Sequence, residues 1–325
     1  MDDELSWIAE ATGAERVRRA ERIQSLWSGY GELFRVRLSG IERETAIVKW
    51  VKPPAQPRGK PTDPSHARKC RSYDVETTWY RTLAKRCDDT CRVPELWGSR
   101  VANGQWLLLL EDLDAAGFSE RRRIATPAEL DTCLAWLAAF HARFLGVAPQ
   151  GLWKSGTYWH LATRPDELAA IDDVALREAA PLLDRKLRGA TFQTLVHGDA
   201  KLANFCFTPS GRAGGGGGAA VAAVDFQYVG GGCGMKDVAY LLSGESSSEA
   251  IEQRHLDTYF TQLRAAIAAR HEEAIDAGAL EAEWRALYPI ACADFYRFLA
   301  GWSKEHWRSD ARGQRLVRSV LRTLG

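Results

Sequence analysis

The chain has 325 residues, of which 46% are apolar and 26% charged, ordinary proportions for a globular protein with two modest cores. Its 43 Lys and Arg balance 42 Asp and Glu, whereas a nucleic-acid-binding domain is usually strongly basic. The longest strongly apolar run, Trp106 to Leu110, is far too short to span a bilayer. The charge balance and the short apolar run therefore predict no nucleic-acid or membrane partner. Because the first residues are acidic, not basic, we expect no secretory signal. The seven cysteines are scattered without a C-x-x-C pair, which predicts reduced thiols and a cytoplasmic protein.

The first third of the chain predicts a small β-rich part with one main helix. Residue pairs typical of turns, Ser39-Gly40 and Asn103-Gly104, separate segments rich in β-formers, which predicts two antiparallel strand pairs. The four predicted strands span residues 34–38, 45–51, 95–100 and 105–110. Two further segments favour helix, namely residues 4–26, interrupted at Gly13, and residues 66–85.

After residue 113 the pattern becomes mainly helical. The clearest helix spans residues 127–145, with Thr126 as N-cap, Pro127 at the first helical position and Gly146 after the end. Residues 166–188 predict another helix, which Pro181 must kink or break. Further segments complete the chain: β-like residues 194–197, 205–208 and 221–226, and helix from about residue 247.

This order of elements predicts an α+β fold with two lobes. We expect a small N-terminal lobe, residues 1–113, built on an antiparallel sheet and one main helix. A larger, mainly helical lobe is expected over residues 114–325. Because ligand sites commonly lie between domains, the two predicted lobes suggest one binding function shared by both.

Two short segments carry residues typical of phosphoryl transfer. The first runs from His197 to Asn204 as His-Gly-Asp-Ala-Lys-Leu-Ala-Asn, and the second is Val-Asp-Phe-Gln around Asp225. Phosphoryl transfer needs an acceptor hydroxyl held in line and cations that neutralise the phosphate charge. Asp199 is the candidate base, and Lys201 is placed to reach the transferred phosphoryl group. Magnesium prefers hard oxygen ligands, which Asn204 and Asp225 supply.

The pattern His-Gly-Asp-x-Lys-x-x-Asn followed by Asp-Phe-Gln resembles the catalytic and metal loops of the aminoglycoside phosphotransferase and choline kinase superfamily, most closely its ecdysteroid kinase-like branch. Two further elements are similar to that branch, Glu-Asp-Leu from Glu111 and Phe-His-Ala from Phe140. The resemblance implies a protein-kinase-like fold, ATP and Mg²⁺ as cofactors, and a small-molecule alcohol as phosphate acceptor.

The predicted N-terminal lobe carries residues in the order that kinases use to hold ATP. Gly29 and Gly31 precede the first predicted strand pair, where kinases place a glycine-rich loop, although a plain turn explains them equally well. Lys49 ends Ala-Ile-Val-Lys, which resembles the Val-Ala-Ile-Lys strand of kinases and suggests a phosphate ligand. Glu76 is its candidate helix partner; a solvated surface charge is the alternative for both. The resemblance places adenine against backbone groups near two further residues, Glu111 and Leu113.

Other functions fit the sequence less well. A catalytically silent pseudokinase usually lacks the base, the metal Asp or the Lys, and all three are present here. A protein kinase would carry Asp-Phe-Gly, where this chain has Gln227, and a metal-dependent hydrolase would need a further His or Asp cluster. His197 and Asp237 are interpreted as braces of the loop. The aromatic run over residues 295–302 fits either core packing or an acceptor pocket, and the identity of the acceptor and the oligomeric state stay open.

Overall fold

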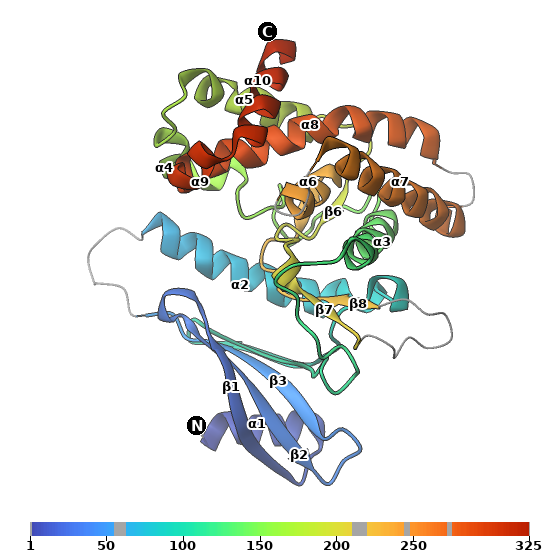
Figure 1. The fold of residues 1–325 in the computed structure, drawn as a ribbon. Helices are drawn as coiled ribbons and strands as arrows, with labels where there is room; N and C mark the ends of the chain where they lie inside the picture. The colour runs from blue at the N-terminus through green and yellow to red at the C-terminus, as the bar shows by residue number, and fades with distance from the viewer. Residues whose placement is uncertain (1, 55–62, 210–219, 244–247, 272–274, 325) are drawn as a thin grey trace. The chain divides into compact units, whose positions relative to one another are not determined.

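The computed structural model describes residues 2–54, 63–209, 220–243, 248–271 and 275–324. The chain forms two compact units (Figure 1). Unit 1 comprises residues 1–121 and 206–227, and unit 2 comprises residues 122–205 and 228–325. Both predicted classes of structure are present, an antiparallel sheet in the N-terminal part and a helical C-terminal part, so the α+β fold class is confirmed. The predicted boundary between residues 113 and 114 stays a prediction.

Unit 1 is built on an antiparallel sheet of five strands in the order β1-β2-β3-β5-β4. Its strands are β1 (Arg16–Ser25), β2 (Gly31–Ser39), β3 (Thr45–Val51), β4 (Leu96–Ala102) and β5 (Gln105–Glu111). The remaining main elements of the unit are helices α1 (Asp2–Thr12) and α2 (Pro64–Thr82) and the short pair β7 (Phe205–Phe207) and β8 (Val221–Ala223). Strand β3 has the predicted bounds, and Asn103 and Gly104 turn between β4 and β5 with positive φ, as predicted.

The helical prediction for residues 4–26 is wrong in its second half, where Arg16–Ser25 forms strand β1. The segment is rich in Arg, Glu and Ala, which favour helix, but it pairs with β2 along its whole length. Only Val17 packs against the core of the sheet, and most of the other side chains are exposed. Pairing with β2 therefore overrides local propensity, and the charged side chains suit an edge strand.

Successive side chains of β3 point to opposite faces of the sheet. Helix α1 packs against one face and α2 against the other (Figure 1). Val48 and Trp50 share one buried cluster with Ile8 of α1. Val51 packs on the other face with Tyr73 of α2. Because successive side chains alternate, Lys49 lies on the same face as Val51 and therefore points toward α2.

Unit 2 is mainly helical, with α8 as its central helix: α4, α5, α6, α9 and α10 contact α8, and α3 packs along α7 (Figure 1). Its longer helices are α3 (Pro127–Arg143), α5 (Val174–Arg188), α7 (Glu249–His271), α8 (Ala277–Trp302) and α10 (Ala311–Leu324). Its shorter elements are α4 (Pro165–Ala169), α6 (Met235–Ser243), α9 (Lys304–Ser309) and the paired strands β6 (Thr194–Val196) and β9 (Gly230–Gly232).

Helix α3 begins as predicted, whereas the predicted 166–188 helix breaks at a different place. Thr126 caps α3 by accepting from the backbone N–H of Glu129, whose carboxylate in turn accepts from the backbone of Thr126. The 166–188 segment divides into α4 and α5 between residues 169 and 174, and Asp173 caps α5. Pro181 lies inside α5, so the prediction that it could break the helix is wrong, and a kink at Pro181 stays a prediction.

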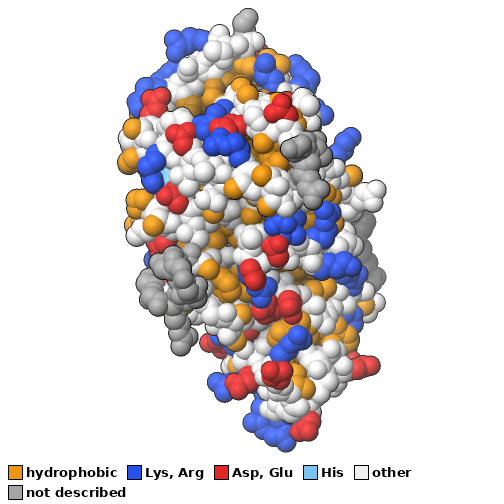
Figure 2. All heavy atoms as spheres, turned by 90° about the vertical axis from the view of Figure 1, so that its right-hand side faces the viewer, with side chains coloured by type: hydrophobic (Ala, Val, Ile, Leu, Met, Phe, Trp, Pro, Cys, Tyr) orange, Lys and Arg blue, Asp and Glu red, His pale blue; other side chains and the backbone are white. Residues whose placement is uncertain are grey.

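The surface shown in Figure 2 carries acidic and basic side chains intermingled, in keeping with the near-zero net charge of the sequence. Within the described ranges, no helix combines the length and the apolarity needed to cross a bilayer.

Candidate active site

Lys49 of unit 1 holds two carboxylates that come from distant parts of the chain. Its ammonium Nζ lies 2.7 Å from Glu76 Oε2 on α2 and 3.1 Å from Asp225 Oδ1. Lys49 and Glu76 are buried, with 7% and 2% of their surface exposed, whereas the side chain of Asp225 is 34% exposed. The predicted pairing of Lys49 with Glu76 is therefore present in the structure, and Lys49 also pairs with Asp225, the candidate metal ligand.

The segment around Asp225 is fixed by its neighbours. Asp225 has φ of 69°, an uncommon conformation for a residue other than glycine. Phe226 stacks on Trp79 of α2 with ring centroids 4.7 Å apart. Gln227 Nε2 donates to Asp225 Oδ1 at 2.7 Å, and Ser72 Oγ lies 3.1 Å from Gln227 Oε1. Backbone strain at Asp225 is thus maintained by aromatic packing and by a side-chain amide, as is common at functional sites.

The charges of this cluster are unequal, because one ammonium faces two carboxylates. Asp225 and Glu76 together hold the pKa of Lys49 above its usual value, against the opposing effect of burial. Burial raises the pKa of Glu76 to about 7, although Lys49 opposes that rise. Lys49 therefore stays cationic, and Glu76 is the group that gains a proton near neutral pH.

Glu76→Gln is expected to flatten the pH dependence of stability. Between about pH 4.5 and about 7, folded Glu76 keeps a proton that the unfolded chain has lost. The contribution of Glu76 to wild-type stability therefore falls as pH rises through this window, by about 1 to 3 kcal/mol. Thermal unfolding midpoints measured across the window should fall less, or rise more, with pH in Glu76→Gln than in wild type. Glu32→Gln is the matched control, because Arg19 lowers the pKa of Glu32 and places its titration below the window. Equal slopes in wild type and Glu76→Gln would contradict this assignment.

Gly29 and Gly31 lie in the turn between β1 and β2, and the structure explains the two glycines in different ways. Ser28 and Gly29 have φ of 57° and 75°, and a Cβ on Gly29 would meet open space. Gly31 has φ of 136°, and a Cβ there would lie 2.0 Å from the carbonyl oxygen of Trp50 on β3. Close packing against β3 is thus sufficient to require Gly31, and its contact with a nucleotide stays a prediction.

The candidate hinge residues take part in contacts within unit 1. The backbone N–H of Glu111 donates to Glu95 O at 2.9 Å, and the carbonyl of Leu113 accepts from Phe118 N at 2.8 Å. The Leu113 side chain is buried against Cys206 and Ala222. The Glu111 N–H is therefore already used, and adenine binding at these positions stays a prediction.

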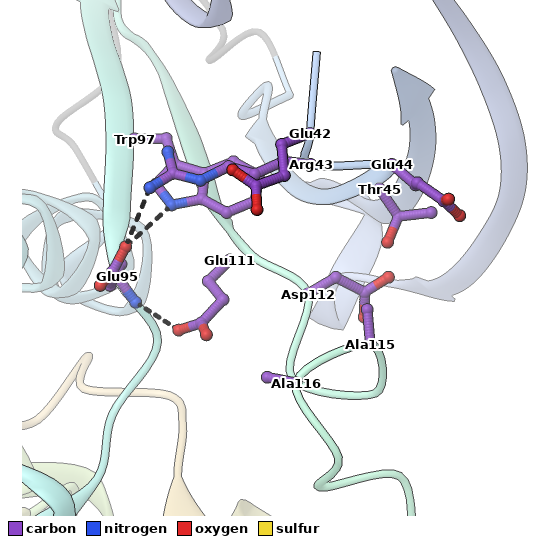
Figure 3. Close-up of a pocket in the computed structure, with 10 residues that line it drawn as sticks. All are labelled: Glu42, Arg43, Glu44, Thr45, Glu95, Trp97, Glu111, Asp112, Ala115 and Ala116. Carbon is purple, nitrogen blue, oxygen red and sulfur yellow. Dashed lines mark hydrogen bonds and ion pairs between the residues drawn. The ribbon is translucent and has the colours of Figure 1, made fainter. Parts of the chain in front are cut away.

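A pocket of about 510 Å³ in unit 1 includes Glu111 but none of Lys49, Glu76 and Asp225 (Figure 3). Carboxylates dominate its lining, which comprises Glu42, Arg43, Glu44, Thr45, Glu95, Trp97, Glu111, Asp112, Ala115 and Ala116. Arg43, its one basic side chain, lies over the Trp97 ring at 4.6 Å and faces Glu95. Such an acidic lining repels the negatively charged phosphates of a nucleotide, and phosphate binding by Lys49 stays a prediction.

The loop after β6 in unit 2 brings three predicted residues together. Lys201 Nζ and Asn204 Nδ2 each donate to Asp199 Oδ2 at 2.9 Å, and Asn204 Nδ2 also reaches the Asp199 carbonyl at 2.8 Å. Asp199 and Asn204 are 6% and 7% exposed, whereas the Lys201 side chain is 46% exposed. The structure thus places Asp199 as a nearly buried carboxylate beside an exposed ammonium, and its role as a base stays a prediction.

Asp237 of α6 holds the backbone of this loop by hydrogen bonds. Its carboxylate is fully buried and accepts from the backbone N–H groups of His197 at 2.6 Å and Gly198 at 2.9 Å. His141 Nε2 lies 3.1 Å from the same carboxylate. His197 Nδ1 accepts from the backbone N–H of Asp199 at 3.2 Å, a contact that braces the loop. Both braces were predicted from the sequence.

The side chains proposed to hold magnesium have suitable donor atoms. Because Asn204 Nδ2 points to Asp199, its Oδ1 is the atom that would bind a cation. Asp225 presents a carboxylate that is 34% exposed, and carboxylate oxygens are ligands that Mg²⁺ prefers. In the part of the chain that the structure describes, no group of three or more His, Cys, Asp or Glu is placed to hold a metal ion. Magnesium bound to ATP needs fewer protein ligands, because it takes phosphate oxygens and waters as further ligands.

Sequence reasoning missed several contacts beside the candidate residues. Gln227 Nε2 donates to Asp225 and Ser72 contacts Gln227 in unit 1, and the backbone N–H of Tyr158 donates to Gly198, beside Asp199, in unit 2. Gln227 was noted as part of the Asp-Phe-Gln pattern and as a departure from the kinase Asp-Phe-Gly pattern, but not as a contact of Asp225. Its place two residues after Asp225 was the one available signal for its contact with that carboxylate.

Comparisons with known proteins give the family. A family model described as the phosphotransferase enzyme family matches residues 60–274, which is more than half of the chain. A search of curated protein sequences finds no match.

Similar solved structures include three kinases or phosphotransferases. An ethanolamine kinase of Plasmodium vivax is 12% identical, with 95% of this chain and 83% of that chain covered and a TM-score of 0.49. A type VIII aminoglycoside-3'-phosphotransferase is 15% identical, with coverages of 91% and 99% and a TM-score of 0.45. The choline kinase LicA of Streptococcus pneumoniae is 12% identical, with coverages of 99% and 98% and a TM-score of 0.43. On the match of the family model, this chain belongs to the phosphotransferase enzyme family.

Proposed function

We propose that this protein transfers the γ-phosphate of ATP to a hydroxyl group of a small molecule. The observation that carries the proposal is the cluster of Lys49, Glu76 and Asp225, which the fold assembles from three distant positions. A buried ammonium held between a helix glutamate and a half-exposed aspartate is the arrangement that kinases use for the phosphates and their metal. Family membership supports the same reaction class.

Lys49 and Glu76 belong to unit 1, and Asp199 and Lys201 belong to unit 2. Lys49 binds the α- and β-phosphates as a point charge, and Glu76 keeps its ammonium in place. Asp199 orients the acceptor hydroxyl and takes its proton, while Lys201 faces the transferred phosphoryl group. Asn204 and Asp225 are the proposed magnesium ligands. Bound magnesium supplies charge neutralisation on the phosphate oxygens.

The acceptor is proposed to be an alcohol, on the basis of the sequence resemblance to kinases of amino sugars, choline and steroids. Residues 295–302 are the candidate acceptor wall, but most of them are buried in unit 2, which fits their reading as core. The experiment is a panel of such alcohols with purified protein, ATP and Mg²⁺, in which ADP release is measured and MgATP binding is followed by calorimetry. We expect Mg²⁺-dependent binding, and ADP release that requires one class of alcohol. Failure to bind MgATP would overturn the proposal, and binding without transfer to any alcohol would favour a silent nucleotide-binding protein.

A further inference from the structure

A histidine of α3 contacts three other elements of unit 2. His141 is fully buried, and both nitrogens of its imidazole ring have a partner. Nε2 lies 3.1 Å from Asp237 Oδ2 on α6, and Nδ1 lies 2.8 Å from the hydroxyl of Tyr259 on α7. The backbone carbonyl of His141 accepts from Thr194 Oγ1 at 2.7 Å, at the start of β6. His141 therefore joins α3 to the strand that leads into residues 197–204, the catalytic loop, and to the helix that holds this loop.

The packing around the imidazole leaves it one orientation. The rings of Trp284 and Tyr259 stand edge-on to it, each with its centroid 6.0 Å away. A Cβ at Gly234 would lie 2.8 Å from His141 Nδ1, closer than side-chain atoms approach, so glycine at this position leaves room for the ring. The enclosed ring keeps Nε2 directed at Asp237.

The proton positions in this contact follow from the partners of Asp237. Its fully buried carboxylate accepts at both oxygens from the backbone N–H groups of His197 and Gly198, and an ionised carboxylate can only accept. His141 Nε2 therefore carries a proton and donates it to Oδ2. In the neutral ring, Nδ1 accepts from Tyr259, which keeps its proton because burial raises its pKa. Because a buried charge without partners is costly, the imidazole N–H stabilises Asp237 in its place.

Asp237 transmits this contact to the residue proposed as the base. His197 and Gly198 directly precede Asp199, so their hydrogen bonds to Asp237 set the path of the backbone that carries Asp199. Gly198 has φ of 82°, and a Cβ there would lie 2.1 Å from the carbonyl oxygen of Tyr228. The loop is thus closely packed where Asp237 holds it, and a displacement of the Asp237 carboxylate would move the main chain of Asp199.

We propose that His141 is a positioning residue of the phosphotransferase reaction, which orients Asp237 and thereby holds the catalytic loop where Asp199 can accept the proton of the acceptor hydroxyl. The inference rests on the proposed function, because His141 acts only through the loop that carries Asp199. A displacement of about 1 Å at a reacting group can lower a rate about 10²-fold, so loss of this contact should be visible in the turnover number.

Two substitutions of His141 separate the roles of its two ring nitrogens. Glutamine places an amide N–H near the position of Nε2 and keeps a donor for Asp237, whereas asparagine is too short to reach Asp237. We expect His141→Asn to lower the turnover number about tenfold or more, and His141→Gln to stay within about threefold of wild type. Turnover is measured as ADP release per folded molecule, with the thermal midpoint of each preparation. A purely structural role of His141 predicts no such rescue by glutamine.

A second buried histidine between the same two helices provides the matched control. His255 of α7 is 1% exposed, and its Nδ1 lies 2.6 Å from Asp131 Oδ1 on α3. Asp131 precedes His141 by ten residues, which is about 15 Å along the helix axis. His255→Gln removes the contact with Asp131, so it should lower the thermal midpoint and leave turnover per folded molecule unchanged.

A double-mutant cycle with Asp237→Asn tests whether His141 acts through that carboxylate. Adding His141→Asn to Asp237→Asn should change the remaining turnover by no more than about twofold. The same fold loss in both backgrounds would overturn the inference. Wild-type turnover of His141→Asn, or equal losses in His141→Asn and His141→Gln, would also overturn it.

A further variant keeps the test informative if His141→Asn does not fold. Tyr259→Phe keeps the aromatic packing but removes the hydroxyl that contacts Nδ1, and it should lower turnover about threefold in wild type and not in His141→Gln. Equal loss in both backgrounds would overturn the inference. Absence of turnover in wild-type protein would instead contradict the proposed function, a result distinct from failure of the cycle.

Discussion

Asp199→Asn is expected to lower the turnover number by roughly 10²- to 10⁴-fold while leaving the affinity for MgATP nearly unchanged. The substitution keeps the shape of the side chain but removes the group that accepts the proton of the acceptor hydroxyl. Asn204 and Asp225 are the proposed metal ligands, so nucleotide binding should survive. ADP release and calorimetric MgATP affinity on one preparation give both quantities.

A purely structural role of Asp199 makes a different prediction. Asp199 accepts from Lys201 and Asn204, so the variant would then lose thermal stability but keep its turnover per folded molecule. Asp184→Asn is a suitable control, because Asp184 pairs with Arg188 one turn further along α5 and should affect neither quantity. A stable Asp199→Asn protein with full turnover would remove Asp199 from the mechanism.

Asp225→Asn is expected to reduce Mg²⁺-dependent turnover by about 10³-fold, because metal stabilisation of phosphate charge is worth several kcal/mol. Asparagine keeps the size of the side chain and an oxygen that Lys49 and Gln227 can contact, but it removes the negative charge that attracts the cation. The loss should be partly recovered at higher Mg²⁺ concentrations. Turnover is measured as a function of Mg²⁺ concentration at saturating ATP.

The control for this variant lies in the same unit. Asp114 forms ion pairs with Arg35 and Arg121 at the surface, and Asp114→Asn should leave the Mg²⁺ dependence unaltered. Unit 1 should stay folded in Asp225→Asn, because Glu76 continues to neutralise Lys49. Wild-type Mg²⁺ dependence in a folded Asp225→Asn protein would mean that Asp225 is not a metal ligand.

The parts of the fold that follow from local chemistry were predictable. Strand β3 is rich in β-formers and has both of its neighbours in the sheet, so its predicted bounds are those of the structure. Helix α3 carries a complete capping box at Thr126, and Asn103-Gly104 supplies the two positive φ values that its hairpin turn needs. In each case the residues that determine the element lie within it or beside it.

The prediction of secondary structure was wrong where contacts with a distant segment determine the element. Nothing in Arg16–Ser25 indicates that β2 lies beside it, so helix propensity pointed to the wrong structure. The break between α4 and α5 follows from the cap at Asp173 and not from Pro181, which α5 accommodates. A capping residue between two helical segments was a better signal than the proline.

The residues of the candidate site also divide into those that local sequence indicates and those that only contacts between distant segments reveal. The residues of the His197–Asn204 loop and Asp225 were found because their spacing is local, and Glu76 because α2 and β3 follow each other closely in the chain. Tyr158, whose backbone N–H donates to the carbonyl of Gly198 beside Asp199, comes from a segment much earlier in the chain. No short pattern joins it to the loop, so only the folded chain shows the contact.

The most direct test of the account is to ask where the γ-phosphate goes. Wild-type protein, Asp199→Asn and Asp225→Asn are incubated with ATP, Mg²⁺ and the best alcohol of the panel, and the products are followed by ³¹P NMR. The account predicts a phosphate monoester of the alcohol that forms in step with ADP in wild type and is almost absent in both variants. Release of inorganic phosphate without an ester, or equal ester formation in all three proteins, would contradict it.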